Sequence, residues 1–236
     1  MASHRYFLSD LHLFSRRSQA ERHVPAIQAT AAAADCLILG GDIFDFRWSH
    51  HRSAERTTQA AMGWLDDLVG SHSQCDFHFV LGNHDSNARF VTALNSYRRQ
   101  RPNLHVHPYL FRDGANVFLH GDAADRPAMC DVKLIQHRRP WEHDEQRGEV
   151  QNLLYDLAVA TRLHKVAGKI AHPRRRVAER LRGYLAKLGH SPETGLKQVY
   201  FGHTHEALHH YQHAHLAFHN GGAPIAGLDF RIVKVS

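Results

Sequence analysis

The stretch Cys36-Leu37-Ile38-Leu39-Gly40-Gly41-Asp42 joins a short apolar run to a glycine turn that ends in a carboxylate. The length and apolar content of the run are typical of a buried β-strand. Four other runs end in a similar way: residues 5–9 before Asp10-Leu11-His12, residues 77–81 before Gly82-Asn83-His84-Asp85, residues 117–119 before His120-Gly121-Asp122, and residues 199–201 before Gly202-His203-Thr204-His205. The repetition predicts five buried strands, each followed by a loop that carries polar side chains.

Helical patterns occupy intervals between these strands, most clearly over residues 24–34 and 57–69. Strands that alternate with helices are typical of a layered α/β fold. The chain has 236 residues, of which 43% are hydrophobic and 22% charged, and this composition supports a large core and argues against a disordered chain. We therefore expect one domain over residues 1–236 that contains an insertion.

The insertion is predicted from a local excess of positive charge and from apolar residues that recur at helical spacing. Residues 126–190 carry 14 Lys+Arg and 7 Asp+Glu, a net charge of +7, whereas the whole chain has +6. Apolar residues recur there at helical spacing over residues 150–170 and again over 177–188, where Arg174, Arg175 and Arg176 begin the second pattern. We expect a basic helical cap over residues 123–196.

A basic helical segment has several interpretations. A solvated charged face is the usual one. The functional alternatives are a cap in which Arg174, Arg175 and Arg176 bind a diphosphate substrate, and an amphipathic surface that rests on anionic lipid. Nucleic acid is a weaker match, because the segment lacks the interleaved aromatic residues on which bases stack.

Residues 209–219, near the end of the chain, alternate in character, with His209, Tyr211, His213, His215 and His219 on one side. This alternation predicts a single strand with a polar, solvated face. It also accounts for several of the 23 histidines without any role in metal binding.

The five loops supply oxygen and nitrogen donors, and in open α/β sheets ligands bind beyond the carboxyl ends of the strands. The candidate metal ligands are Asp10, His12, Asp42, Asn83, His120, His203 and His205. This donor set suits Mn, Fe or Zn, and two such ions about 3.5–4 Å apart can hold a hydroxide and stabilise both ends of an in-line displacement at phosphorus. A turn or a helix cap would account for any single Asp, but not for five strands that all end in donors.

For Asp45 and Asp122, lining the site and supporting a loop are equal alternatives.

These motifs, in this order, resemble the five motifs of the calcineurin-like metallophosphoesterases. The resemblance implies a two-sheet sandwich flanked by helices. It also implies a dinuclear centre in which Asp42 bridges, Asp10, His12 and His205 complete one ion's site, and Asn83, His120 and His203 complete the other's. His84 would stabilise the transition state or protonate the leaving oxygen, and Asp85 would orient His84. If Asp122 lines the site, it would contact substrate.

Within that family, the basic insertion between the fourth and fifth motifs is similar to the cap of bacterial UDP-2,3-diacylglucosamine diphosphatases, although His84 stands where their best-known branch has Arg. The expected function is hydrolysis of a phosphate ester or diphosphate bond with two divalent ions, Mn first, on a nucleotide-lipid substrate. The alternatives are a soluble phosphodiesterase or phosphomonoesterase acting on nucleotides or phosphoproteins, and a non-catalytic scaffold of the same fold.

Three widely spaced cysteines argue against a disulfide framework, and no apolar stretch reaches the length of a membrane span. We expect a cytoplasmic protein, and contact of its basic helices with the inner face of the membrane remains one of the alternatives given above.

Overall fold

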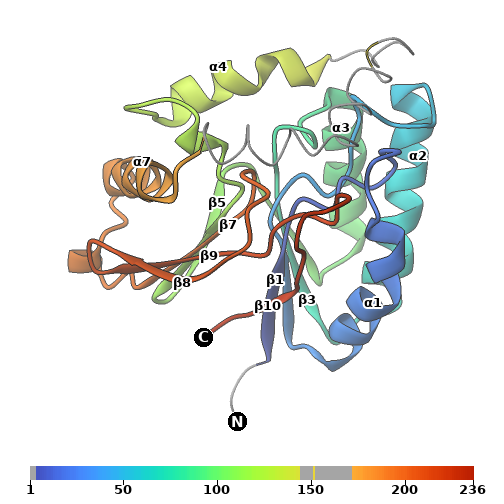
Figure 1. Cartoon of the computed structure of the whole chain (residues 1–236). Helices are drawn as coiled ribbons and strands as arrows, with labels where there is room; N and C mark the ends of the chain where they lie inside the picture. Colours follow the sequence, from blue (N-terminus) through green and yellow to red (C-terminus); the bar gives the residue numbers. More distant parts are fainter. Residues whose placement is uncertain (1–3, 144–150, 152–171) are drawn as a thin grey trace.

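The structure is a computed structural model that describes residues 4–143, 151 and 172–236. Two five-stranded sheets form its centre (Figure 1). The first has the order β10-β1-β2-β3-β4, with bounds Val233–Lys234, Arg5–Leu8, Cys36–Leu39, Asp76–Val80 and Leu104–His107. The second has the order β5-β6-β7-β9-β8, with bounds Leu110–Asp113, Asn116–Leu119, Gln198–Phe201, Leu216–Asn220 and Leu208–His213.

In Figure 1, α1, α2 and α3 lie on the outer face of the first sheet, α7 lies on the outer face of the second, and α4 crosses above both. Their bounds are α1 Val24–Ala33, α2 Ala54–Leu65, α3 Ala88–Tyr97, α4 Asp131–Glu142 and α7 Arg174–Lys187. A π-helical turn at Asp66–Gly70 extends α2, and short 3-10 turns lie at Ala20–His23, Arg98–Gln100, Asp122–Ala124 and Pro192–Thr194.

The prediction of a two-sheet α/β sandwich is confirmed, as are the five strands and both helical patterns. β1, β2 and β3 pair in parallel in one sheet, and β6 and β7 pair in parallel in the other. Because parallel neighbours end at the same edge, the loops after these strands lie together.

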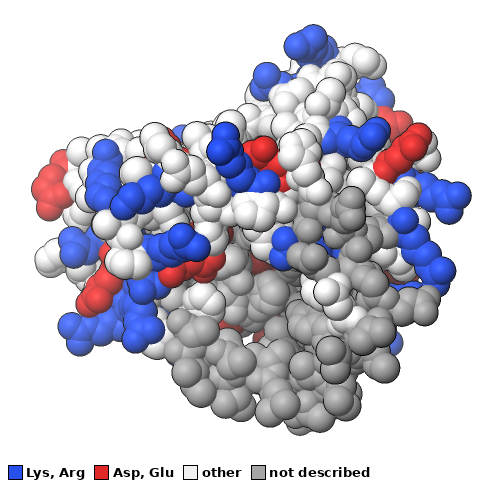
Figure 2. All heavy atoms as spheres, turned by 90° about the horizontal axis from the view of Figure 1, so that it is seen from above, with Lys and Arg blue, Asp and Glu red and all other residues white. Residues whose placement is uncertain are grey.

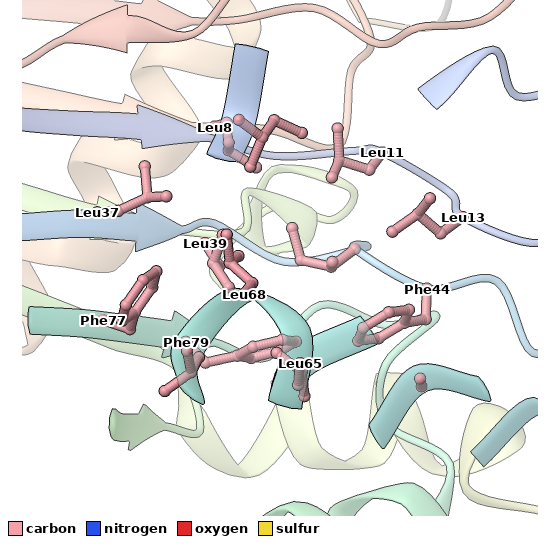
Figure 3. Packing of buried hydrophobic residues seen from close by; sticks show 14 of the residues in the cluster. Leu8, Leu11, Leu13, Leu37, Leu39, Phe44, Leu65, Leu68, Phe77 and Phe79 are labelled. Atoms are coloured by element: carbon pink, nitrogen blue, oxygen red, sulfur yellow. The ribbon is translucent and has the colours of Figure 1, made fainter. Parts of the chain in front are cut away.

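Strand residues alternate between two buried layers. Leu37 and Leu39 of β2 face the layer under α1, α2 and α3, where Figure 3 shows them packed with Phe77 and Phe79 of β3. Ile38, between them, faces the layer between the sheets, which includes Phe7, Phe118 and Tyr200. Burial on both faces explains why these strands are continuous apolar runs in the sequence.

The outer face of the second sheet is covered by α7. Its residues Val177, Leu181 and Leu185, one helical face, pack with Val199 and Phe218 of the sheet. The helix predicted from residues 177–188 is thus confirmed. The helical pattern over residues 150–170 lies outside the described residues apart from Gln151, and a cap over residues 123–196 stays a prediction.

The single strand predicted over residues 209–219 is wrong. The segment forms the antiparallel hairpin of β8 and β9, with His213 paired to Leu216. The two turn residues, Ala214 and His215, both have positive φ, 48° and 65°, which is the backbone of a type I′ turn. Neither residue is a glycine or asparagine, so the turn left no signal in the sequence. His219 is buried rather than solvated.

The three cysteines all lie in the described residues and are free thiols. Among the helices of the described residues, none combines the length and the apolar character needed to cross a membrane.

Candidate metal centre

The loops after β1, β2, β3, β6 and β7 bring the seven candidate ligands to one place at the carboxyl ends of these strands. Asp10, His12 and His205 form one group whose ligand atoms all lie within 4.8 Å of one another. Asp42, His120 and His203 form a second such group, and His12, Asp42 and His84 a third.

Asp42 lies between the first two groups. Its Oδ2 is 3.2 Å from Nε2 of His120 and 3.9 Å from Nε2 of His12. Asn83 joins the His120 side, where its Oδ1 lies 3.1 Å from the same His120 nitrogen. On the other side, Nε2 of His12 and Nε2 of His205 are 3.0 Å apart. One carboxylate oxygen therefore faces both donor groups, as a bridging ligand would.

The backbone at this site is strained. Five of the donors have φ in the left-handed region: Asp10 at 55°, His12 at 46°, Asp42 at 52°, His203 at 66° and His205 at 55°. Such conformations cost of the order of 1–3 kcal/mol each and cluster at functional sites. Hydrogen bonds between the loops hold them. The Asp10 amide donates to Gly41 O at 2.9 Å, and the His203 amide donates to Asp10 Oδ1 at 2.7 Å.

The buried carboxylates of the site favour the binding of a cation. Asp10 is fully buried and Asp42 is 2% exposed. Burial raises the pKa of Asp10, and the nearby charge of Asp42 raises it further. For Asp42, burial opposes ionisation, but His120 and His84 hold its pKa well below the usual range. Buried carboxylates beside imidazole nitrogens are compensated by bound divalent ions, and these O and N donors fit Mn, Fe or Zn.

The structure gives Asp85 contacts other than the expected one with His84. Its carboxylate accepts backbone amides of Ile43 at 3.3 Å, Phe44 at 3.0 Å and Gly82 at 3.2 Å. Burial and the charge of Asp42 raise the pKa of Asp85 to about 6. Asp85 therefore organises the loops after β2 and β3 and does not orient the His84 ring.

Asp45 takes the position that was expected of Asp85. Its Oδ1 lies 3.0 Å from Nδ1 of His84, and its Oδ2 lies 3.6 Å from Nδ1 of His12. Although burial opposes it, the charge of His84 lowers the pKa of the Asp45 carboxyl. Of the two alternatives for Asp45, the structure places it at the site.

The contacts of Asp122 correspond to the second alternative, structural support. Arg138 of α4 binds it in a bidentate pair, with Nε to Oδ2 at 2.7 Å and Nη2 to Oδ1 at 2.8 Å. Both residues are buried. Both carboxylate oxygens of Asp122 are thus engaged in anchoring α4, and substrate contact by Asp122 stays a prediction.

The three arginines that begin α7 are exposed. Arg174 donates through Nε and Nη2 to Oε1 of Glu206, at 3.0 and 2.7 Å, next to His205. Arg175 pairs with Glu179 one turn along the helix, at 3.0 Å. Substrate contact by Arg174, Arg175 and Arg176 stays a prediction.

Sequence reasoning missed three residues near the site. Oδ1 of Asp125 lies 2.7 Å from Nε2 of His203, and its Oδ2 lies 3.0 Å from Nε2 of His137 on α4. The ring of Trp141, also on α4, lies over His84 with centroids 4.4 Å apart. Asp125 follows a recognised motif by three residues, a usable signal, whereas His137 and Trp141 reach the site only through the placement of α4.

A comparison with protein-family models agrees with this geometry. The family model described as calcineurin-like phosphoesterase matches residues 4–207. A comparison with curated protein sequences finds no significant match. Thirty-one chains of solved structures match. One is a dimetal phosphatase from Danio rerio, with 14% identity over 94% of this chain and 87% of that chain and a TM-score of 0.44.

Proposed function

Since this chain belongs to the calcineurin-like phosphoesterase family, and is thereby a metal-dependent phosphoesterase, we propose how its own residues carry the reaction. Asp10, His12, Asp42 and His205 would hold one divalent ion, and Asp42, Asn83, His120 and His203 the other. The observation that carries this proposal is the position of Asp42 Oδ2, which faces His120 at 3.2 Å and His12 at 3.9 Å. When bound, the two ions supply a hydroxide nucleophile and neutralise the charge that develops at phosphorus.

His84 would donate a hydrogen bond or a proton to the leaving oxygen. Its ring is held from two sides, by Asp45 at Nδ1 and by the ring of Trp141. The contact at Nδ1 leaves Nε2 as the nitrogen that can face substrate. Asp45 also lies beside His12, so that the same carboxylate orients a metal ligand and the proton donor.

The preferred substrate is a nucleotide-lipid diphosphate of the UDP-diacylglucosamine type, with Mn as the metal. A mostly apolar cavity of about 340 Å³ beside α4 supports the lipid part, because Leu81, Val91, Tyr109 and Ile135 line it. Arg138 and Glu142 are charged residues of its wall. Val132 and Ile135 are the exposed large hydrophobic residues of the described chain, 64% and 42% exposed, and both lie on α4. These two side chains would add apolar contacts to the charge attraction between the basic segment and a membrane.

A soluble phosphodiesterase or phosphomonoesterase is the second candidate, favoured by the strongly cationic surroundings of α4 described below. A non-catalytic scaffold is disfavoured, because the donor set and His84 are complete.

The enzyme proposal is tested with bis-p-nitrophenyl phosphate and p-nitrophenyl phosphate in the presence of Mn, Fe or Zn. We expect turnover that His84→Ala reduces strongly and that Arg182→Gln, an exposed change on α7, leaves intact. No turnover with any metal, or an unchanged rate in His84→Ala, contradicts the proposal. Release of UMP from UDP-diacylglucosamine tests the lipid substrate separately, and its absence at high enzyme concentration favours the soluble alternative.

A further inference from the structure

A second cavity, of about 670 Å³, lies on the side of α4 away from the apolar cavity. It has the size of a small-molecule site. Most of its described walls are cationic or apolar, among them Arg47, Arg126, Lys133, Trp141, Met129 and Pro140. No carboxylate occurs among these described lining residues. Figure 2 shows the face above the sheets, where many Lys and Arg side chains project from the described part of the chain.

Two wall residues of this cavity are connected to the metal centre, one directly and one through Asp125. Trp141 lies on the ring of His84, with centroids 4.4 Å apart. His137 contacts Asp125, and the other oxygen of Asp125 contacts His203. On one wall, only Trp141 therefore separates the cavity from His84, the candidate proton donor. On the other wall, His137 and Asp125 separate it from His203, a candidate metal ligand.

The cationic groups of the cavity are arranged around an apolar surface. Cζ of Arg47 lies 3.3 Å from the centre of the Trp141 ring, and this contact helps to hold the ring in place. Lys133 reaches the carbonyl of Ala128 at 3.3 Å, and Arg126 is exposed. Positive groups that converge without a carboxylate among the described walls raise the local concentration of anions.

We propose that this cavity binds a second anionic group of the substrate, a phosphate or a comparable oxyanion, while the reacting phosphoryl group lies at the metal centre. Arg126 and Lys133 make charge-assisted hydrogen bonds to the second group, and Trp141, Met129 and Pro140 contact the adjoining apolar part of the molecule. The substrate class is then a phosphorylated molecule with at least two anionic groups. This inference rests on the proposed function, because it assigns the reacting phosphoryl group to the metal centre.

The test compares ligands that differ by one phosphate, fructose 6-phosphate with fructose 1,6-bisphosphate and UMP with UDP. Binding to the Mn-loaded protein is measured by calorimetry, so that the result does not depend on turnover. In the unchanged protein we expect the second phosphate to tighten binding about 10- to 100-fold in at least one pair, the range of charge-assisted hydrogen bonds. In Arg126→Gln/Lys133→Gln that ratio should fall to about 1, the value for a phosphate that makes no such bonds.

The control is Arg182→Gln, which removes a positive charge from an exposed position of α7 outside the cavity and should keep the ratio. Turnover of bis-p-nitrophenyl phosphate should be unchanged in Arg182→Gln. The proposal is overturned if neither pair shows a gain, if the double variant keeps the gain, or if it weakens both members of each pair equally. A gain that depends on Arg126 and Lys133 in a protein without phosphoesterase turnover would support the cavity and contradict the proposed function.

Discussion

Gly202 brings the loop after β7 against the loop after β1. A Cβ atom at this position would overlap the carboxylate of Asp10 and the side chain of Ser9. Both neighbours are fully buried, so neither has room to move aside. The absence of a side chain at residue 202 is thus a condition for the position of a candidate metal ligand.

Gly202→Ala should therefore displace Asp10 and reduce both metal content and turnover. Metal content per chain is measured by elemental analysis after dialysis against limiting Mn. Gly183→Ala is the matched control, because a Cβ there meets nothing within 4 Å and alanine favours a helix over glycine by about 1 kcal/mol. Full metal content and activity in Gly202→Ala would show that the close approach has no such role.

Asp45 and Asp85 are buried carboxylates with different partners, and their Asn variants should separate catalysis from stability. Asp45→Asn weakens the hold on His84 and His12 and should lower kcat about 10- to 100-fold, as for other residues that orient metal ligands. Asp85→Asn places an amide NH₂ against backbone N–H donors, should cost about 1–3 kcal/mol of folding free energy, and should lower Tm.

Steady-state kinetics and thermal unfolding of both variants decide between these roles. Asp45→Asn should keep a Tm near that of the unchanged protein. The reverse result, a catalytic loss with normal Tm in Asp85→Asn and a stability loss alone in Asp45→Asn, would restore the role expected from the sequence.

At the scale of elements, the hairpin of β8 and β9 contains a buried histidine that couples stability to pH. His219 stacks on Tyr200 with centroids 4.6 Å apart, and its Nε2 lies 2.8 Å from Oε1 of Gln198. Burial, helped by the charges of His210 and His209, lowers the pKa of His219 to about 4. The unfolded chain, with an ordinary His pKa of about 6.5, then binds more protons than the folded chain between these values.

Stability should accordingly fall as the pH drops from about 6.5 toward 4, since protons favour the state that binds more of them. His219→Phe preserves the stacking on Tyr200 and removes the titration. The midpoint of urea unfolding should decline less steeply with acidification in this variant than in the unchanged protein at the same metal concentration. Because the variant also loses the contact with Gln198 at every pH, the slopes are compared. Equal slopes would assign the acid sensitivity to other groups, such as His78, whose pKa burial lowers to about 3.

At the scale of the whole molecule, the metal centre joins the two sheets. Asp10, Asp42 and Asn83 follow strands of the first sheet, and His120 and His203 follow strands of the second. Ions bound by both sets would hold the two sheets together at their carboxyl ends. The apolar layer that contains Phe7, Phe118 and Tyr200 joins the same sheets below that edge.

Mn should therefore raise Tm as well as activity. An ion present at 100 times its dissociation constant stabilises the folded state by about 2.7 kcal/mol, which for a chain of this length is a rise of roughly 5–10 °C. Differential scanning fluorimetry of chelator-treated protein with and without Mn measures it. Asp42→Ala, which removes the carboxylate between the two groups, should abolish most of the rise. Equal Tm values with and without Mn would contradict a centre that spans both sheets.

Much of this molecule was predictable from local patterns. The five strands appear within one residue of their predicted starts and ends, because strands buried on both faces are continuous apolar runs. The donors at the strand ends were identified because they follow those runs directly. The β8–β9 hairpin was missed, because its turn at Ala214 and His215 has no glycine, asparagine or proline.

The sequence by itself determined the order of the strands along the chain, the residues that end them, and the family of phosphoesterases to which these motifs belong. Only the tertiary structure decided that Asp45 rather than Asp85 holds His84, that Asp122 is paired with Arg138, and that Trp141 and His137 of α4 reach the metal centre. The physical reason is that strand formation depends on burial patterns within a few residues. The partner of a buried charge is instead set by the packing of loops and helices that are far apart along the chain.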